Sequence, residues 1–496
     1  MNRQKQSHIL PAWPQRLIRL LLPSMAAVLS ACASVAPPVA DLQATHVPAT
    51  WSAVDAGAAS STRATPLADW WQRFDDPDLT DLVTQALQSN TSVRGAQAAL
   101  QQARALRDVQ AASLGPSVGA SASAQRGRSG NQGSNNRFQA GFDASWEPDI
   151  FGGNRSALDA SDADALAAQT SLGDTQVSLA AEVALNTVNL RGLQARIAIA
   201  RNNLAAQRET LQITRWRTQA GLASSLEVEQ AVAASEQTAA QIPALQTSID
   251  QTIHALAVLT GQAPGDLQAS LTQPRPIPQP PADLALAFPA ETLRQRPDVR
   301  TAEYRVSAAL ARVAVADAAR YPSFRLSGSL GLSALTLGTL TNGAAVVSSL
   351  LAGVSAPLFD GGAARARVKA QEAALEQSRT NYQGTVLTAL QDVEDALVAL
   401  RGDRERLARL QAAADSAANA ELLARQRYES GLIDFRAVLD TQRTLLSTQD
   451  SVANTRTSLV NDHVRLYKAL GGGWTPDAVA NGGGAVAPAT GAATRP

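Results

Sequence analysis

Residues 323–332 read SFRLSGSLGL, and apolar and polar side chains alternate along the whole stretch. One parity carries Phe324, Leu326, Leu330 and Leu332, while the other carries Arg325 and the serines. A period of two is typical of a β-strand with one apolar and one polar face. About ten residues is also the length that crosses a bilayer when the strand is tilted. The stretch therefore predicts a membrane strand.

Two further runs alternate in the same way, at residues 118–124 and 138–146, and a fourth run lies near residues 346–358. The segments that separate the two members of each pair, residues 127–136 and 333–343, are rich in Gly, Ser and Asn. Such segments suit hairpin loops. The sequence thus predicts two β-hairpins, far apart in the chain.

Each hairpin is followed by apolar residues in a heptad pattern, which is typical of long packed helices. These residues are Val183, Leu190, Leu193, Ile197, Leu204 and Leu211 in the first half, and Val386, Leu390, Val393, Leu397, Leu400 and Leu407 in the second. No proline interrupts residues 154–220 or 363–430. A helix of that length measures on the order of 100 Å, and the charges that recur along it favour water over lipid. Gly221 and Gly431 are expected to end these helices, and a second helix returns from each to Gly261 and Gly471.

The two halves are copies of one unit. A shift of 206 residues pairs Pro116-Ser117 with Pro322-Ser323, and a shift of 210 pairs Gly221-Leu222 with Gly431-Leu432. Because the offset drifts little, both halves carry the same elements in the same order. We predict a first repeat at 65–261 (helix, hairpin, long helix, return helix), a proline-rich linker at 262–289, a second repeat at 290–471 and a disordered tail at 472–496.

The N-terminus has the features of a targeting segment. Residues 1–31 contain four basic and no acidic residues, followed by a short apolar run, which predicts a cleaved signal peptide. Leu29-Ser30-Ala31-Cys32 resembles a bacterial lipobox, in which cleavage leaves Cys32 to receive lipid. Ala33 follows, where an aspartate would favour retention in the inner membrane, so we expect a lipid-anchored outer-membrane protein with residues 32–64 extended. The alternative is a chance cysteine in an ordinary signal sequence.

Composition argues against several other classes. The chain has 43 Lys+Arg against 43 Asp+Glu and a single cysteine, which gives no support for nucleic-acid binding, intramolecular disulfides or thiolate metal sites. His46, His254 and His463 are not at metal-ligand spacing, and no nucleophile elbow or phosphate loop is present. We expect no catalytic residue, no metal and no cofactor beyond the lipid on Cys32, and hence no enzyme.

Four membrane strands in one chain leave open sheet edges, which hydrocarbon does not tolerate. The strands must therefore close with other copies of the chain. Eight strands is the smallest common barrel, so two or more chains are required. Physical reasoning alone leaves a dimer and a trimer open.

Several motifs together resemble the TolC family of outer-membrane efflux channels, and within it the lipoproteins that serve resistance-nodulation-division (RND) pumps. They are Trp70-Trp71 with Phe74-Asp75-Asp76-Pro77-Asp78-Leu79, Arg296-Pro297-Asp298-Val299-Arg300 with Ala302-Glu303, Phe359-Asp360-Gly361-Gly362, and Arg427-Tyr428 before Gly431-Leu432. The resemblance spans residues 65–472. It implies an α+β membrane protein: a homotrimer with a 12-stranded β-barrel continuous with a periplasmic α-helical barrel.

The resemblance also implies a function and partners. The trimer would be a passive exit duct for drugs or other small solutes, working with a periplasmic membrane-fusion adaptor and an inner-membrane RND transporter that supplies the energy. Two alternatives stay open: a type I secretion duct for proteins, and a structural periplasmic coiled-coil scaffold. The scaffold does not explain the hairpins, and the secretion duct does not explain the lipobox.

Two groups of residues are carried over from the resemblance. The helix tips, Gly221-Leu222 and Gly431-Leu432, would meet the adaptor; the alternative is that the glycines only stop helices and the leucines pack locally. Asp440 would ring the closed aperture, or be an ordinary solvated acid. Tyr428 would latch the aperture by hydrogen bonding, with Asp434 as its possible companion.

Overall fold

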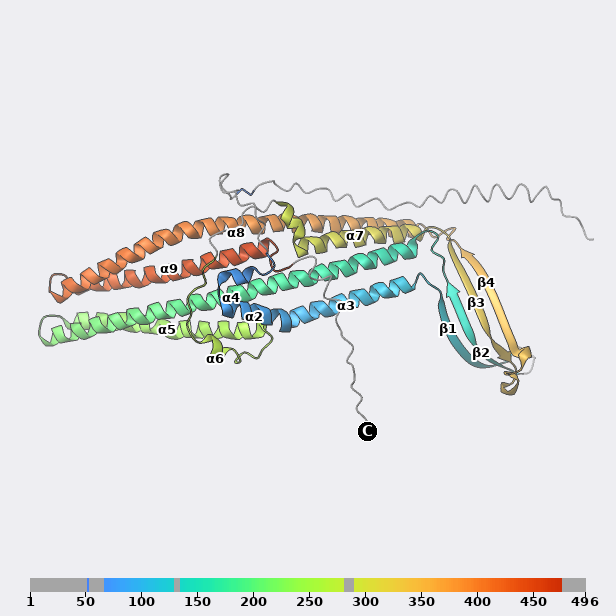
Figure 1. Ribbon diagram of the computed structural model, residues 1–496, viewed down its shortest axis with the longest axis horizontal. Coiled ribbons are helices and arrows are strands. Elements are labelled where there is room, and N and C mark those ends of the chain that lie inside the picture. Colours follow the sequence, from blue (N-terminus) through green and yellow to red (C-terminus); the bar gives the residue numbers. More distant parts are fainter. Residues whose placement is uncertain (1–50, 53–66, 129–133, 281–289, 475–496) are drawn as a thin grey trace, which may run out of the picture.

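The structure is a computed structural model and describes residues 51–52, 67–128, 134–280 and 290–474. Figure 1 shows an elongated molecule, with a long helical body joined at one end to a sheet. The expected signal peptide and Cys32 lie outside the described residues. Most of the segment 32–64 lies outside them too.

The sheet contains both expected hairpins. Its strands are β1 (Ser117–Gly127), β2 (Asn135–Trp146), β3 (Ser323–Ala334) and β4 (Val346–Ser355). They are antiparallel in the order β1-β2-β3-β4. Strands β2 and β3 join the two halves of the chain, so β1 and β4 are the edges of this sheet. The loop after β3 contains two short 3-10 turns, η3 (Leu337–Thr339) and η4 (Gly343–Ala345).

The long helices are confirmed at nearly the expected bounds. Helices α4 (Gly153–Gln219) and α8 (Ala363–Glu429) have 67 residues each, and the return helices α5 (Ser225–Leu259) and α9 (Phe435–Ala469) have 35 each. Figure 1 shows the two long helices running from the sheet to the far end of the body, where the return helices begin. Their turns form the tips of the molecule.

The helices before the hairpins are α3 (Thr91–Ala112) and α7 (Pro297–Ala318). The prediction of one helix before the first hairpin was wrong, because α2 (Pro77–Ser89) and the 3-10 turn η1 (Trp70–Phe74) precede α3. Asn90 divides α2 from α3: its extended backbone ends α2, its side chain accepts from Ser92 N at 2.7 Å and donates to Leu259 O at 2.8 Å. In the second half, the 3-10 turn η2 (Ala290–Gln295) precedes α7.

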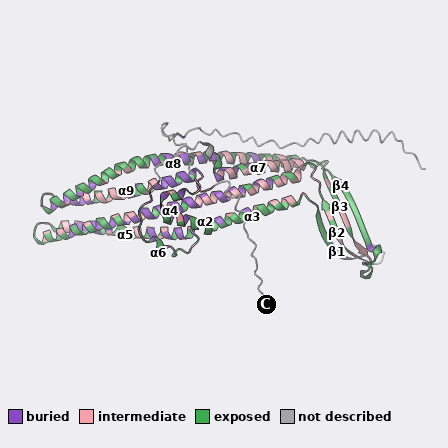
Figure 2. Cartoon of the chain, viewed as in Figure 1, coloured by how far each residue is buried: buried purple, intermediate pink, exposed green. Residues whose placement is uncertain are grey.

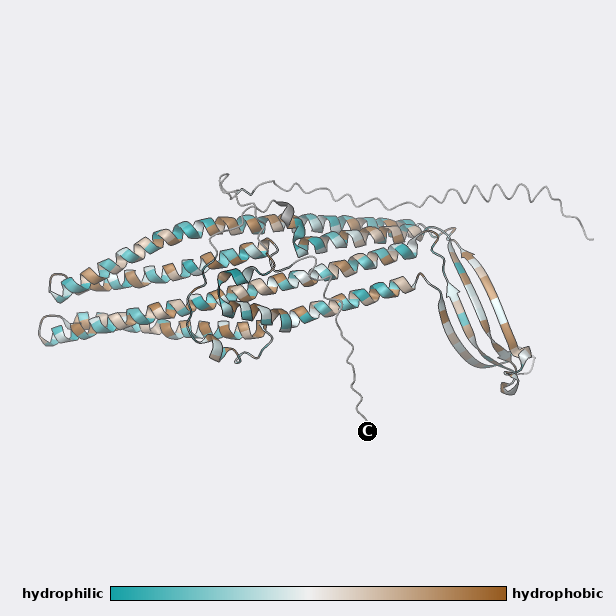
Figure 3. Ribbon diagram, in the orientation of Figure 1, coloured by the Kyte–Doolittle hydropathy of each residue, from teal (hydrophilic) through white to brown (hydrophobic). Residues whose placement is uncertain are grey.

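The helical core follows the heptad prediction. Most of the predicted heptad residues are buried, and Leu193, Leu390 and Leu407 are half-buried. Buried residues are concentrated along α4 and around α2, whereas α8 exposes much of its length (Figure 2). Figure 3 shows polar and apolar residues interleaved along the helices, while β4 is strongly apolar. Among the described helices, none is both long enough and apolar enough to cross a membrane.

An aromatic and ionic cluster holds the N-terminal elements against the middle of the body. Trp70 stacks on Tyr467 of α9 at a centroid distance of 5.2 Å. Arg191 of α4 is fully buried and donates to Asp78 of α2 at 2.5 Å. Because a buried charge is costly without a partner, this pair fixes how α2 lies on α4.

Two predicted segment boundaries need correction. The linker at 262–289 is not extended throughout, because α6 (Gln268–Leu271) forms within it and Gln194 of α4 donates to the carbonyl of Leu271 at 2.8 Å. The tail prediction was also wrong at its start: Gly472 is buried, and Trp474 lies against Gly173 of α4. Residues 281–289 and 475–496 lie outside the described residues.

Candidate functional site

The strand sheet has the two chemically different faces that the alternation predicts. Ala120, Phe142 and Leu330 pair across β1, β2 and β3, and so lie on one face. On the other face Ser121 donates to Asp143 at 2.8 Å, and Ser329 and Ser349 are 2.7 Å apart. Strand β4 departs from this pattern, because it carries apolar side chains on both faces. An apolar face for lipid and a polar face for water is the pattern of a membrane barrel wall.

The tips at the other end of the body have the same backbone geometry in both repeats. Gly221 and Gly431 both have a φ of 73°, a left-handed conformation that favours glycine. The amide of Gly221 donates to Thr218 O and that of Leu222 to Arg217 O, at 3.0 and 2.8 Å. This double closure is the Schellman motif, so the glycines are required to end the helices.

The leucines that follow do not pack locally. Leu222 is 69% exposed and Leu432 is 74% exposed. An exposed leucine on a rigid turn has no part in the core of its own chain, although it can supply an apolar anchor to a partner. The tips therefore offer two apolar points, one from each repeat.

Tyr428 connects the two tips. Its ring is buried and lies 5.5 Å from the ring of Phe435. Its hydroxyl donates to Glu227 Oε2 at 3.3 Å, and Thr214 Oγ1 lies 3.5 Å away. Burial raises the pKa of the Tyr428 phenol, and the negative charge of Glu227 acts in the same direction, so the hydroxyl keeps the proton that it donates.

Arg217 is the second connection between the tips. Its Nη1 donates to the carbonyl oxygens of Tyr428 and Glu429, at 2.8 and 3.3 Å. Its guanidinium also lies 4.6 Å from the centroid of the Tyr428 ring. Arg217 thus binds the last turn of α8, whose free carbonyls favour a cation.

Sequence reasoning missed Thr214, Arg217 and Glu227. Glu227 had a signal, because Ser224 and Glu227 have the spacing of a capping box, and the amide of Glu227 donates to Ser224 Oγ at 3.4 Å. Arg217 aligns with Arg427 at a shift of 210 residues, and nothing in that alignment distinguishes the two. The contacts of Arg217 depend on how α4 lies against α8.

The structure places Asp434 and Asp440 differently from Tyr428. Asp434 is the N-cap of α9 and accepts from the amide of Ala437 at 3.1 Å. In the described residues the carboxylate that reaches Tyr428 is that of Glu227, not that of Asp434. Asp440 is exposed on α9, and its counterpart Gln230 on α5 is half-buried.

The two described histidines lie on helices in different surroundings. His254 is exposed on α5, and His463 is buried on α9. Within the described ranges, no group of three or more His, Cys, Asp and Glu side chains could hold a metal ion. His46 lies outside those ranges.

An amphipathic sheet with two open edges, attached to a helical body with paired apolar tips, defines a subunit of a membrane channel. The model of the outer membrane efflux protein family matches residues 82–262 and again residues 288–472. The chain belongs to this family, and the two matches reproduce the internal duplication. The resemblance to TolC-family channels is thereby confirmed.

Individual relatives agree over nearly their whole length. The toluene efflux pump outer membrane protein TtgF of Pseudomonas putida is 30% identical over 423 residues, which cover 84% of this chain and 87% of TtgF. The outer membrane protein OprJ of Pseudomonas aeruginosa is 31% identical over 458 residues, which cover 91% and 95%. The solved outer-membrane channel OprN superposes with a TM-score of 0.81 at 37% identity, covering 86% of this chain and 98% of that one.

The chain is therefore an outer-membrane efflux channel that extends into the periplasm and serves as a component of an efflux pump. It belongs to a family of channels rather than of enzymes.

Proposed function

We propose that three copies of this chain form the exit duct of a tripartite efflux system. The sheets of three copies would close into a 12-stranded barrel, and the helical bodies would continue it as a tube. The observation that carries the proposal is the amphipathic sheet with edges at β1 and β4, joined to helices of 67 residues. These helices measure about 100 Å, which suits a duct across the periplasm.

The duct conducts solutes passively, and its cargo consists of small molecules such as antibiotics and organic solvents. The family match and the relative named as a toluene efflux pump protein support this class of cargo. Energy is supplied by an inner-membrane RND transporter, and a periplasmic adaptor joins the two. The exposed Leu222 and Leu432 are the proposed adaptor contacts.

A lipid on Cys32 is consistent with the geometry of the N-terminal segment. Ser52 donates to both carboxylate oxygens of Glu394 on α8, at 2.7 and 2.9 Å. Glu394 lies 31 residues after the start of α8, about 46 Å from the sheet. Trp51 lies 19 residues after Cys32, and a chain of that length reaches at most about 65 Å. A lipid on Cys32 can thus enter the membrane that the sheet crosses.

The tip contacts are the proposed latch of the closed aperture. Tyr428–Glu227 and Arg217–Tyr428 tie the tip of α4 and α5 to that of α8 and α9, and an aperture that opens by separating the tips must break them. Asp440, exposed nearby, would form a ring of three carboxylates that attracts cations. Unchanged cation selectivity in Asp440→Asn would remove Asp440 from this role.

Reconstitution tests the proposal directly. The purified chain should form trimers that conduct ions in planar bilayers, and it should restore resistance to toluene or antibiotics in a strain that lacks its own channel but keeps the pump and adaptor. A monomeric chain without conductance would instead support the scaffold. A conducting trimer that exports a protein substrate of an ABC exporter, and no drug, would support the secretion duct.

A further inference from the structure

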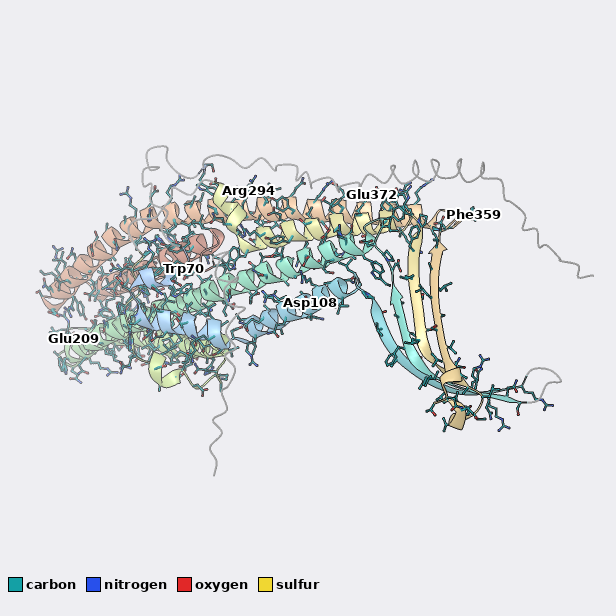
Figure 4. The ribbon with its side chains drawn as sticks, turned by 45° about the vertical axis from the view of Figure 1, so that its right-hand side comes forward. Trp70, Asp108, Glu209, Arg294, Phe359 and Glu372 are labelled. Atoms are coloured by element: carbon teal, nitrogen blue, oxygen red, sulfur yellow. The ribbon has the colours of Figure 1, made fainter. Side chains whose placement is uncertain are left out.

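Two large apolar side chains stand almost fully exposed where the sheet joins the body. Leu358 is 97% exposed and Phe359 is 94% exposed. They lie between β4 and α8, and Figure 4 places Phe359 at the junction between the sheet and the helices. Such exposure of a neighbouring pair marks a contact surface.

The first repeat has an equivalent pair, Ile150 and Phe151, between β2 and α4. Phe151, which stays 36% exposed, packs against the second repeat: its ring stacks on Tyr321 at 4.9 Å and on Phe324 at 6.5 Å. Tyr321 and Phe324 form the joint between α7 and β3. Within one chain, the segment that leads from β2 into α4 therefore packs against the segment that leads from α7 into β3.

The two joints are equivalent despite a difference in residue order. Asp149 accepts from the first amides of α4, including Arg155 N at 2.7 Å. Asp360 accepts from those of α8, including Ala364 N at 2.7 Å. In the first repeat the apolar pair follows the aspartate, and in the second it precedes it.

Within the described residues, the segment between β4 and α8 has no ring contact like the one that Phe151 makes. In the first repeat, α4 packs on α7 and β2 pairs with β3. The equivalent neighbours of α8 and β4 are α3 and β1, which lie at the opposite edge of the sheet. Only the α3 and β1 of another copy can take these places, because the chain forms an open arc.

The segment between α3 and β1 has room for Leu358 and Phe359 of another copy. A shift of 206 residues aligns Gly115 with Tyr321 and Val118 with Phe324. Gly115 and Val118 are smaller than Tyr321 and Phe324, so they leave space where the second repeat has two aromatic rings. Val118 is itself 69% exposed, and Val109 on the preceding helix is 63% exposed, so apolar surface extends around this space.

We infer that Leu358 and Phe359 of one copy seat on residues 115–118 of the next copy, forming an inter-copy anchor at the junction of barrel and body. The anchor reproduces between copies the contact that Phe151 makes within each copy. It rests on the trimer proposed above and names the residues that close it. The pair would then face a protein surface rather than lipid.

Cysteine cross-linking in the membrane-inserted full-length chain tests the anchor. Phe359→Cys combined with Val118→Cys should give covalent dimers and trimers after oxidation with copper phenanthroline, seen in denaturing gels without reductant. Each single variant should give neither, which also controls for Cys32. Phe151→Cys with Phe324→Cys is the matched control, because its cross-link lies inside one chain and adds no mass.

The outcomes separate this inference from the trimer itself. Native gels in mild detergent report the oligomer for every variant. Intact trimers without inter-copy cross-links would overturn the anchor and leave the proposed function standing. A second measurement uses a fluorophore attached at Phe359→Cys and a lipid-soluble quencher. Quenching as strong as at a lipid-facing strand position would also overturn the anchor and leave the proposed function standing. A chain that never forms trimers would overturn both.

Discussion

Removal of the Arg217 side chain should release the proposed latch. In the structure its Nη1 makes a hydrogen bond of 2.8 Å to the Tyr428 carbonyl and one of 3.3 Å to Glu429, and its guanidinium lies 4.6 Å from the Tyr428 ring. A hydrogen bond from a charged donor contributes about 1.5–3 kcal/mol, and a partly exposed cation–π contact about 0.5–1 kcal/mol. Arg217→Ala should therefore weaken the closed state by about 2–4 kcal/mol per copy.

This free energy corresponds to at least a roughly 30-fold rise in the ratio of open to closed tips. Single-channel recording in planar bilayers should show it as longer dwell in the high-conductance state. Arg427→Ala is the matched control, because Arg427 occupies the equivalent position in the second repeat and is exposed. Tyr428→Phe removes the 3.3 Å bond to Glu227 and the 3.5 Å contact with Thr214 but leaves the bonds that Arg217 donates, and it should act more weakly. If Arg217→Ala trimers open no more often than Arg427→Ala trimers, the latch assignment is wrong.

Three further perturbations test other parts of the molecule. Leu222→Asp with Leu432→Asp should abolish drug resistance while trimers and conductance persist, because only the proposed adaptor contact is lost; resistance at the wild-type level would refute docking there. Arg191→Met should lower the free energy of unfolding by about 1.5–3 kcal/mol, since it removes the charged hydrogen bond to the half-buried Asp78, which keeps its ion pair with Arg275, and a thermal shift no larger than that of a surface arginine variant would contradict this. Burial, with the nearby Arg404, lowers the pKa of His463 to about 4. An unfolded chain takes up this proton near pH 6.5, so stability should fall as the pH drops from about 6.5 to about 4. His463→Gln should lose that part of the pH dependence, and identical profiles would exclude it.

Periodicity made the elements of this fold predictable. Alternation in the strands and heptads in the helices each indicate which side of an element is buried. The glycines at 221 and 431 indicate a left-handed backbone conformation that other residues rarely adopt. The break at Asn90 had a weaker signal, because asparagine is a preferred N-cap residue but also occurs inside helices. Its role depends on the carbonyl of Leu259, 169 residues away.

The candidate site was less predictable for the same reason. The sequence identifies Tyr428 by resemblance, but its partner depends on how the tip of α5 lies beside that of α8. Asp434 is close to Tyr428 in sequence and is occupied as a helix cap. Glu227, about 200 residues earlier, supplies the carboxylate. Local spacing encodes caps and turns, whereas contacts between helices require their relative placement.

The latch shows how a duplicated chain becomes asymmetric. At the shift of 210 residues that relates the tips, Tyr428 aligns with Thr218 and Glu227 aligns with Ala437. The pseudo-equivalent pair, Thr218 and Ala437, therefore cannot form this hydrogen bond, because the alanine side chain has no acceptor and a threonine is too short to replace the phenol. A trimer would carry three such latches around six pseudo-equivalent tips. Opening of the proposed duct would then break these contacts at alternate pairs of tips. Duplication thus supplies two copies of the tip geometry, and the departures from duplication determine which residues tie the two tips of one chain together.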